Sequence, residues 1–236
     1  MSPIKQVAVG GSHTVALLKN GTAWATGYNN FGQLGIGTSG AGTDTSVLTL
    51  MATETNSNII AIAAGTYHTL VLRSDGKVWA TGSNSSGALG NGPVVSGNKS
   101  VLTEMTTTTN SNIVAIAAGE HSVVLRNDGT VWATGLNGDG QIGIGTQSAG
   151  LRILTKMIGA DNANIKAISA KGRFSVVLKS DGTVYATGLN TAGQLGVGSG
   201  FTRKLILSAM TDNNANISAI SAGNNTTMAL KPDGIV

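Results

Sequence analysis

The sequence predicts an all-β protein, a propeller-type array of four-stranded antiparallel blades, and three observations lead to this prediction. The string Thr-Gly-x-Asn-x-x-Gly-x-[Leu/Ile]-Gly-x-Gly occurs four times in register in the 236 residues. An Asn-Gly or Asp-Gly pair precedes each copy and lies between two apolar runs. The glycines of these pairs recur at intervals of 52 to 55 residues, a period typical of propellers and similar arrays. They are Gly21, Gly76, Gly129, Gly182 and, in a shortened last copy, Gly234.

Each period contains four strand-like pieces. The first alternates as Ile-x-Ala-Ile-x-Ala, as in Ile59–Ala64, and the second ends in an apolar trio such as Leu70–Leu72. The Asn-Gly or Asp-Gly pair then predicts a hairpin with a type I′ turn, in which both central residues have positive φ. The third piece is Val-Trp-Ala-Thr-Gly, as in Val78–Gly82, and an Asn-[Ser/Ala]-Asn turn leads into the next period. A fourth piece of pattern Leu-[Thr/Ser]-x-Met is expected at Leu48–Met51, Leu102–Met105, Leu154–Met157 and Leu207–Met210.

We expect one domain over residues 1–236, because a single period is too small to fold alone. Ordering about fifty residues costs on the order of 80 kcal/mol, which one sheet with two apolar faces does not offset. Stability must therefore come from contacts between neighbouring units. The expected repeats cover approximately residues 5–58, 59–112, 113–164 and 165–216, with a partial repeat at 217–236.

The composition narrows the function classes. Charged residues make up 11% of the chain, against roughly 25% in ordinary domains, and the surface polarity comes from Thr, Ser, Asn and Gly. The net charge is +4, but the basic residues before the turn glycines are dispersed along the repeats and predict no nucleic-acid-binding face. These residues are Lys19, Arg73, Arg126, Lys179 and Lys231. Cysteine is absent, which excludes disulfides and thiolate chemistry.

Localisation stays open at this stage. The first residues lack the apolar core of a signal peptide, and no apolar run approaches the ~20 residues of a membrane helix. We expect a soluble chain, and the composition favours a virion or extracellular setting.

Two sets of residues that occupy equivalent positions in successive repeats, which we call columns, could form a metal-binding or ligand-binding site. Both are better explained by structural roles. The three histidines, His13, His68 and His121, share one repeat position, so they are expected in successive blades and not around one ion. A buried, hydrogen-bonded structural role is the favoured interpretation, with metal binding as the alternative. The tryptophan column favours core packing over a stacking platform for bases or sugars. It contains Trp24, Trp79 and Trp132, with Tyr185 in the fourth repeat.

No other motif predicts an active site. Gly138–Gly143 formally matches the dinucleotide fingerprint Gly-x-Gly-x-x-Gly, but no helix is expected after it. Asn137–Gly140 faintly resembles a calcium loop and lacks the downstream glutamate. The turn aspartates Asp75, Asp128, Asp181 and Asp233 are explained by turn chemistry, and the glutamates Glu54, Glu104 and Glu120 are scattered. We therefore predict no catalytic, cofactor-binding or metal-binding residues, no cofactor and no enzyme activity.

The repeats resemble those of a known family. Its pattern runs Ala-x-x-Ala-Gly-x-x-His-[Ser/Thr], an apolar strand, Asp-Gly-x-[Val/Leu]-[Trp/Tyr], then Gly-x-Asn-x-x-Gly-Gln-Leu-Gly-x-Gly. The second repeat matches with Ala61–Gly65, His68-Thr69, Asp75-Gly76, Val78-Trp79 and Gly82–Gly92. This is the regulator-of-chromosome-condensation (RCC1-like) repeat family, and the resemblance covers essentially the whole chain. It implies a β-propeller with one blade per repeat. The family typically closes a ring of seven blades, so four and a half repeats imply an open arc or an atypical small ring.

Three functions remain as hypotheses. The first is a structural or protein-interaction module that forms part of a larger assembly, such as a phage, virion or surface structure. The second, implied by the resemblance, is a regulatory protein that promotes nucleotide exchange on a small GTPase. The third is a glycan- or receptor-binding propeller. We expect a protein partner or self-association through the open sheet ends or through the variable loops Thr38–Ser46, Pro93–Ser100 and Gln147–Gly150, without contact to a membrane.

Overall fold

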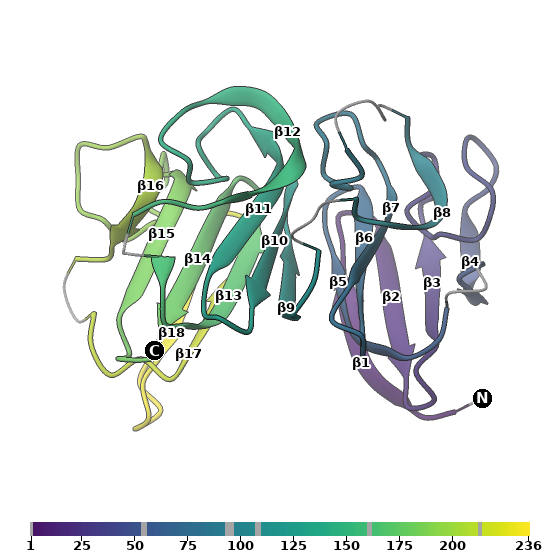
Figure 1. Cartoon of the computed structure of the whole chain (residues 1–236), viewed down its shortest axis with the longest axis horizontal. Helices are drawn as coiled ribbons and strands as arrows, with labels where there is room; N and C mark the ends of the chain where they lie inside the picture. Colours follow the sequence, from purple (N-terminus) through teal and green to yellow (C-terminus); the bar gives the residue numbers. More distant parts are fainter. Residues whose placement is uncertain (1, 53–55, 93–96, 107–109, 160–161, 212–213) are drawn as a thin grey trace.

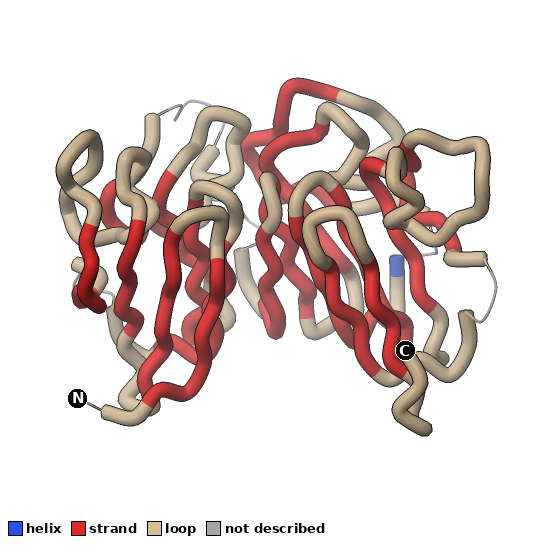
Figure 2. The backbone as a smooth tube through the Cα atoms, turned by 180° about the vertical axis from the view of Figure 1, so that it is seen from behind, coloured by secondary structure: helices blue, strands red, loops and turns tan. Residues whose placement is uncertain are grey.

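The chain forms an open arc of four antiparallel four-stranded sheets, followed by a two-stranded half-sheet (Figure 1). The computed structural model describes residues 2–52, 56–92, 97–106, 110–159, 162–211 and 214–236. Within these residues there are eighteen strands, no α-helix and one short 3-10 piece at Asn162, the blue segment in Figure 2. The all-β prediction is therefore confirmed, and the arc is the open one of the two predicted forms.

Each sheet is a simple meander in chain order. The first blade contains β1 (Ile4–Val9), β2 (His13–Leu18), β3 (Ala23–Gly27) and β4 (Thr45–Leu50). The second contains β5 (Ile59–Ala64), β6 (His68–Arg73), β7 (Val78–Gly82) and β8 (Lys99–Glu104). The third contains β9 (Ile113–Ala118), β10 (His121–Arg126), β11 (Val131–Asn137) and β12 (Ser148–Lys156). The fourth contains β13 (Ile165–Lys171), β14 (Phe174–Lys179), β15 (Val184–Leu189) and β16 (Arg203–Ala209), and the half-blade contains β17 (Ala219–Ala222) and β18 (Thr227–Leu230).

The first strands of the blades, β1, β5, β9, β13 and β17, lie next to one another along the inner side of the arc. The arc curves enough for the ammonium group of Lys171 on β13 to donate a hydrogen bond of 2.8 Å to the carbonyl oxygen of Val9 on β1. The inner strands of the first and fourth blades therefore face each other across the axis.

The hairpins between second and third strands form where the sequence predicts them, but the predicted turn type is wrong. At the first hairpin only Gly21 has positive φ, at 79°, while Asn20 does not. The Asn20 side chain accepts hydrogen bonds from the backbone N–H and the hydroxyl of Thr22, and this local capping stabilises a type I turn followed by a left-handed glycine. The aspartate hairpins repeat the pattern, since Asp128 accepts the same two bonds from Thr130.

The fourth strands begin earlier than predicted. β4 starts at Thr45 and β12 at Ser148, so parts of the expected variable loops belong to strands, and Gln147–Gly150 is mostly strand. These starts carry no apolar alternation. They are set by pairing with the third strand, as in the pair Gly27↔Thr45. Residues 93–96 of the expected loop Pro93–Ser100 lie outside the described residues.

The hydrophobic core lies between blades and not within them. One cluster joins Val15 and Leu17 of the first blade to Ile62 and Val71 of the second, and three similar clusters follow along the arc. A buried asparagine after the fourth strand of a blade is hydrogen-bonded to the start of the third strand of the same blade. The Asn56 amide, for example, donates to the carbonyl oxygens of Ala23 and Met51 and accepts from the Ala23 N–H.

Both ends of the arc expose surfaces that are buried elsewhere. On the first blade Ile4, Val7 and Val9 are 51%, 54% and 64% exposed. On the half-blade Met228 and Leu230 are 55% and 39% exposed. The equivalent positions of the second blade, in β5 and β6, are at most 7% exposed. The open sheet ends that the sequence predicts are therefore present.

Candidate interaction surface

The histidine column lies at the interfaces between blades. Each imidazole Nε2 is hydrogen-bonded to a hydroxyl of the following blade, in the pairs His13–Thr69 at 3.0 Å, His68–Ser122 at 2.9 Å and His121–Ser175 at 2.6 Å. Each hydroxyl donates its own hydrogen to a backbone carbonyl oxygen of the preceding blade. The hydroxyl must therefore accept from Nε2–H, so each imidazole is assigned as the neutral Nε2–H tautomer.

Burial keeps these imidazoles uncharged. It lowers the pKa of His68 and of His121 to about 3, and with the nearby Lys171 it lowers the pKa of His13 to about 4. Among the described residues, no three His, Asp or Glu side chains come close enough together to hold a metal ion.

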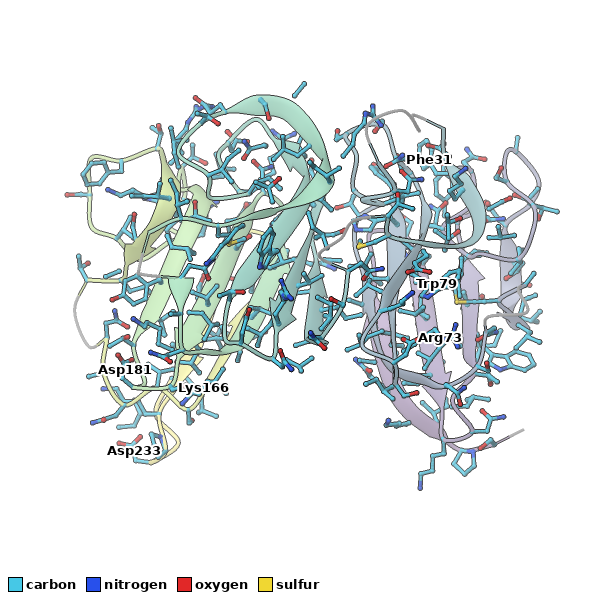
Figure 3. The ribbon with its side chains drawn as sticks, viewed as in Figure 1. Phe31, Arg73, Trp79, Lys166, Asp181 and Asp233 are labelled. Carbon is cyan, nitrogen blue, oxygen red and sulfur yellow. The ribbon has the colours of Figure 1, made fainter. Side chains whose placement is uncertain are left out.

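The tryptophan column lies at the margin of the same interfaces, and its members are only half-buried. The guanidinium of Arg73 lies 5.8 Å from the ring centre of Trp79, and that of Arg126 lies 5.8 Å from the ring centre of Trp132. Figure 3 labels the first of these pairs. Lys179 lies 5.6 Å from the ring centre of Tyr185 in the same way. Three of the basic residues before the turn glycines, Arg73, Arg126 and Lys179, thus cover aromatic rings of their own hairpins, which explains why these three recur once per repeat.

The other sequence motifs carry no site geometry. A turn, and not a helix, follows the formal dinucleotide match at Gly138–Gly143, so no helix N-terminus is available there for a pyrophosphate. Asp139 of the calcium-like segment is paired with Arg173. Glu104 pairs with Lys77 on the surface, and Glu54 lies outside the described residues.

Comparing the repeats with one another distinguishes the sequence positions that they share from those that vary. In an antiparallel meander the connections β1–β2 and β3–β4 leave from one end of the blade. We call the end that carries these connections, and their equivalents in the other blades, the loop face. Phe31 lies at this end in Figure 3, and Asp181 and Asp233 lie at the other. The variable positions of the Thr-Gly-x-Asn-x-x-Gly frame, and the residue before the histidine column, belong to these connections.

Two clusters occupy the variable positions of the loop face. The first is aromatic and spans the first and second blades. The ring centres of Tyr28 and Phe31 are 6.1 Å apart, and those of Phe31 and Tyr67 are 5.1 Å apart, both in edge-on geometry. Tyr67 is 46% exposed, although aromatic residues make up only 4% of the chain. Three of its few aromatic side chains outside the shared columns therefore gather on one surface.

The second cluster is charged and spans the third and fourth blades. The Arg173 guanidinium lies 3.3 Å from a carboxylate oxygen of Glu120 and 3.3 Å from one of Asp139. Arg203 approaches Asp139 at 3.9 Å. Glu120, followed by Asp139, raises the pKa of Arg173 above its usual value. Arg173 remains half-exposed, so this cluster presents charge to solvent.

A cavity of about 240 Å³ lies between the two clusters. Its walls include Tyr67 on one side, Glu120 and Arg173 on the other, and the hydroxyls of Ser83, Ser85 and Ser86. We name the surface formed by Tyr28, Phe31, Tyr67, Glu120, Asp139 and Arg173 the loop-face patch. Sequence reasoning missed it, because its members are distant in the sequence and lie outside the three variable loops that were expected to bind a partner. Comparing the variable positions between repeats would have marked Tyr28, Phe31 and Tyr67 as unusual aromatic residues, but not shown that they meet.

Comparisons with known proteins agree with this architecture. A family model described as "RCC1-like domain" matches residues 1–236. The chain belongs to the RCC1-like family. One relative is the ultraviolet-B receptor UVR8 of Arabidopsis thaliana, with 32% identity over 83% of this chain and 43% of the relative. Another is the regulator of chromosome condensation of Mus musculus, with 27% identity over 83% of this chain and 49% of the relative. The chain thus spans about half the length of these relatives.

Solved structures of this family share the fold. Human WBSCR16 superposes with a TM-score of 0.86 at 21% identity, over 98% of this chain and 61% of that chain. Yeast RCC1 (Prp20), solved bound to Kap60, superposes with a TM-score of 0.83 at 21% identity, over 98% of this chain and 55% of that chain. The repeats of this chain are therefore propeller blades. No helix in the described part of the chain is long and apolar enough to cross a membrane.

Proposed function

We propose that this chain is a non-catalytic regulatory module that binds a protein partner through the loop-face patch. The observation that supports the proposal is the different location of the residues that the repeats share and of those that vary between repeats. Shared residues pack between blades, whereas aromatic and charged residues at variable positions gather in the patch. Exposed aromatic side chains beside charged groups and an arginine are the composition that protein interfaces favour.

The relatives support a regulatory partner more than a structural assembly. One relative is named a secretion-regulating guanine nucleotide exchange factor of Bos taurus, with 30% identity over 81% of this chain and 42% of the relative. A solved Saccharomyces cerevisiae structure, Prp20p, is described with its binding to Gsp1p and histones. The hypothesis of a virion or surface-assembly component finds no support among these relatives. Nucleotide exchange on a small GTPase is the second candidate, because exchange factors occur among them.

The experiment uses the whole chain, one double variant of the patch and one control variant. Proteins captured by the wild-type chain are compared with those captured by the double variant Phe31→Ala/Tyr67→Ala and by Phe201→Ala. Phe201 is a matched control, since it is 50% exposed and lies outside the patch. A partner lost only with the double variant is then purified, and its affinity is measured by calorimetry. We expect the double variant to weaken binding roughly thirty-fold or more, as central aromatic contacts do.

A purified partner that binds the double variant as tightly as the wild type would contradict the proposal. A panel of small GTPases loaded with fluorescent GDP tests the second candidate. Accelerated release that depends on Arg173 and Glu120 would establish exchange activity. Partner binding without release from any GTPase would leave a binding module that acts without exchange.

A further inference from the structure

The cavity of about 240 Å³ in the loop-face patch lies between the second and third blades, and we call it the loop-face cavity. A side chain that the other repeats share is missing at this place. We propose that the loop-face cavity binds the carboxamide of a glutamine side chain of the protein partner. This inference rests on the proposed function, because it names the group that the partner inserts into the loop-face patch.

Ala88 stands where three other repeats have a glutamine. The glutamine follows the second glycine of the Thr-Gly-x-Asn-x-x-Gly frame, and its copies are Gln33, Gln141 and Gln194. All three are at most 4% exposed. The Oε1 atom of each accepts a hydrogen bond of 2.9 to 3.0 Å from the backbone N–H two residues earlier. A buried carboxamide therefore satisfies a backbone donor in these repeats.

The second blade has the donor without the acceptor. The N–H of Ser86 is equivalent to those that the glutamines satisfy, and it has no acceptor in the described part of the chain. Ser86 and Ala88 both line the loop-face cavity. By equivalence with the other repeats, this N–H points to the place of the missing carboxamide. An entering carbonyl oxygen would restore the hydrogen bond.

The side chains that bridge the blades beside the glutamine are also different here. At the first and third interfaces the bridges are the ring contact Phe31–Tyr67 and the ion pair Asp139–Arg173. The equivalent residues at the second interface are Ser86 and Glu120. The serine side chain ends at its hydroxyl, one bond beyond Cβ, and both residues line the cavity. The place of the missing glutamine is therefore open to a partner.

The chemistry of the walls favours a carboxamide over water or a carboxylate. One water needs only about 10–15 Å³ of such space, far less than the cavity offers. The Nε2 atoms of Gln33 and Gln141 have no hydrogen-bond partner in the described chain. The cavity offers acceptors for such a nitrogen, because the Glu120 carboxylate and the Ser83 hydroxyl lie in its walls. A carboxylate would instead place a second negative charge beside Glu120.

The probe is N-acetyl-L-glutamine methylamide, titrated into the 15N-labelled whole chain and followed by NMR. We expect a saturable shift of the Ser86 amide signal, with a dissociation constant of roughly millimolar order for so small a ligand. The homoleucine analogue has methyl groups in place of the carboxamide oxygen and nitrogen. It should bind about five-fold more weakly or less, because it cannot accept from the Ser86 N–H.

Two further probes distinguish the source of the amide. N-acetyl-L-glutamate methylamide tests a carboxylate, and N-acetylglucosamine tests a glycan, which also presents an amide oxygen. Both should bind more weakly than the glutamine probe. A shift that does not saturate, equal binding of the homoleucine analogue, or equal or tighter binding of the glutamate analogue or the sugar would overturn the proposal.

Two substitutions at one position locate the probe. Ala88→Gln places the chain's own carboxamide in the cavity and should abolish the probe-dependent shift of Ser86. This variant should fold as the wild type does, because glutamine occupies the equivalent place in three repeats. Ala88→Gly leaves the space open and should retain binding. Unchanged probe binding by Ala88→Gln, with an unchanged thermal unfolding midpoint, would contradict the proposal.

The captured partner separates this inference from the proposed function. Ala88→Gln should weaken partner binding about ten-fold or more, as the loss of a central contact does. If Phe31→Ala/Tyr67→Ala loses the partner and Ala88→Gln keeps full affinity, the proposed function stands and this inference falls. If only Ala88→Gln loses the partner, the inference stands and the role of the aromatic cluster falls.

Discussion

The strands β1 and β5 occupy the same place in consecutive blades and have similar apolar sequences, yet their burial differs. Ile4, Val7 and Val9 are more than half exposed, whereas Ile59 and Ile62 are 2% exposed. The first blade lies in front of β5, whereas no blade of the described residues lies in front of β1. Burial in this fold therefore depends on the neighbouring blade and not on the strand's own sequence, as expected for a repeat array.

The interfaces between blades also differ from one another in the residue at the histidine position. The interfaces that follow the first three blades contain a buried neutral histidine, and the one that follows the fourth contains Phe174 instead. The predictions below use such pairs of equivalent positions, beginning with the largest expected effect.

Acid should destabilise the three interfaces that contain a histidine more than the interface that contains Phe174. The pKa of each histidine is lowered by burial, to about 4 for His13 and about 3 for His68 and His121, from an ordinary value of 6.5. The unfolded chain therefore binds more protons, so this stability is complete above pH 6.5 and is lost as the pH falls from 6.5 towards 3. Each histidine contributes a slope of about 1.4 kcal/mol per pH unit in this window.

Urea unfolding across pH 7 to 4 checks this prediction. The variant His68→Phe places the residue of the fourth blade at a histidine interface and should reduce the slope by the share of one histidine. An unchanged slope in this variant would show that other groups cause the acid sensitivity.

Core truncation should distinguish an internal interface from the open end. Leu70 is completely buried, and Leu70→Ala should lower the free energy of unfolding by about 2–5 kcal/mol. The equivalent residue Met228 is 55% exposed, so Met228→Ala should cost less than about 1 kcal/mol. Equal losses in urea denaturation would mean that the open end is covered in solution.

Removing one threonine hydroxyl should lower the free energy of unfolding by a smaller amount. The loss should again be larger at an interface between blades than within one blade. The Thr134 hydroxyl lies within hydrogen-bonding distance of the Gly87 carbonyl oxygen across an interface and of the Leu151 carbonyl oxygen in its own blade, whereas the Thr26 hydroxyl donates to the Thr45 carbonyl oxygen of its own blade. We expect Thr134→Val to cost about 1–3 kcal/mol and Thr26→Val clearly less. Thermal unfolding of the two variants compares them directly.

The loop-face patch should contribute least to stability. Arg173 is half-exposed, and its ion pair with Glu120 is of the surface type, worth about 0–1 kcal/mol. The Asp139 side chain is only 12% exposed, but it keeps Arg203 as a second partner at 3.9 Å when Arg173 is replaced. Arg173→Gln should therefore leave the unfolding free energy almost unchanged while it weakens partner binding. A large loss of stability would place this residue among the structural ones.

The sequence predicts the repeated parts of this fold well, because the same signals recur in each period. The hairpin positions follow from Asn20-Gly21 and its equivalents, but the turn type does not, since the Asn20 side chain caps the turn locally. The early start of β4 could not be read from Thr45-Ser46, because it depends on pairing with β3. The patch could not be predicted from either cluster alone, since Phe31 and Tyr67 meet only when two blades stack.

Amide hydrogen exchange of the isolated chain tests most directly whether neighbouring blades determine burial and protection. Leu70 and Val71 in β6 occupy the same repeat positions as Met228 and Ala229 in β18. We predict slow exchange across β6, at a rate set by global unfolding, and exchange in β18 that is faster by orders of magnitude. Equal protection of the two strands would contradict the account, because an incomplete sheet would then be as stable as one held between two blades.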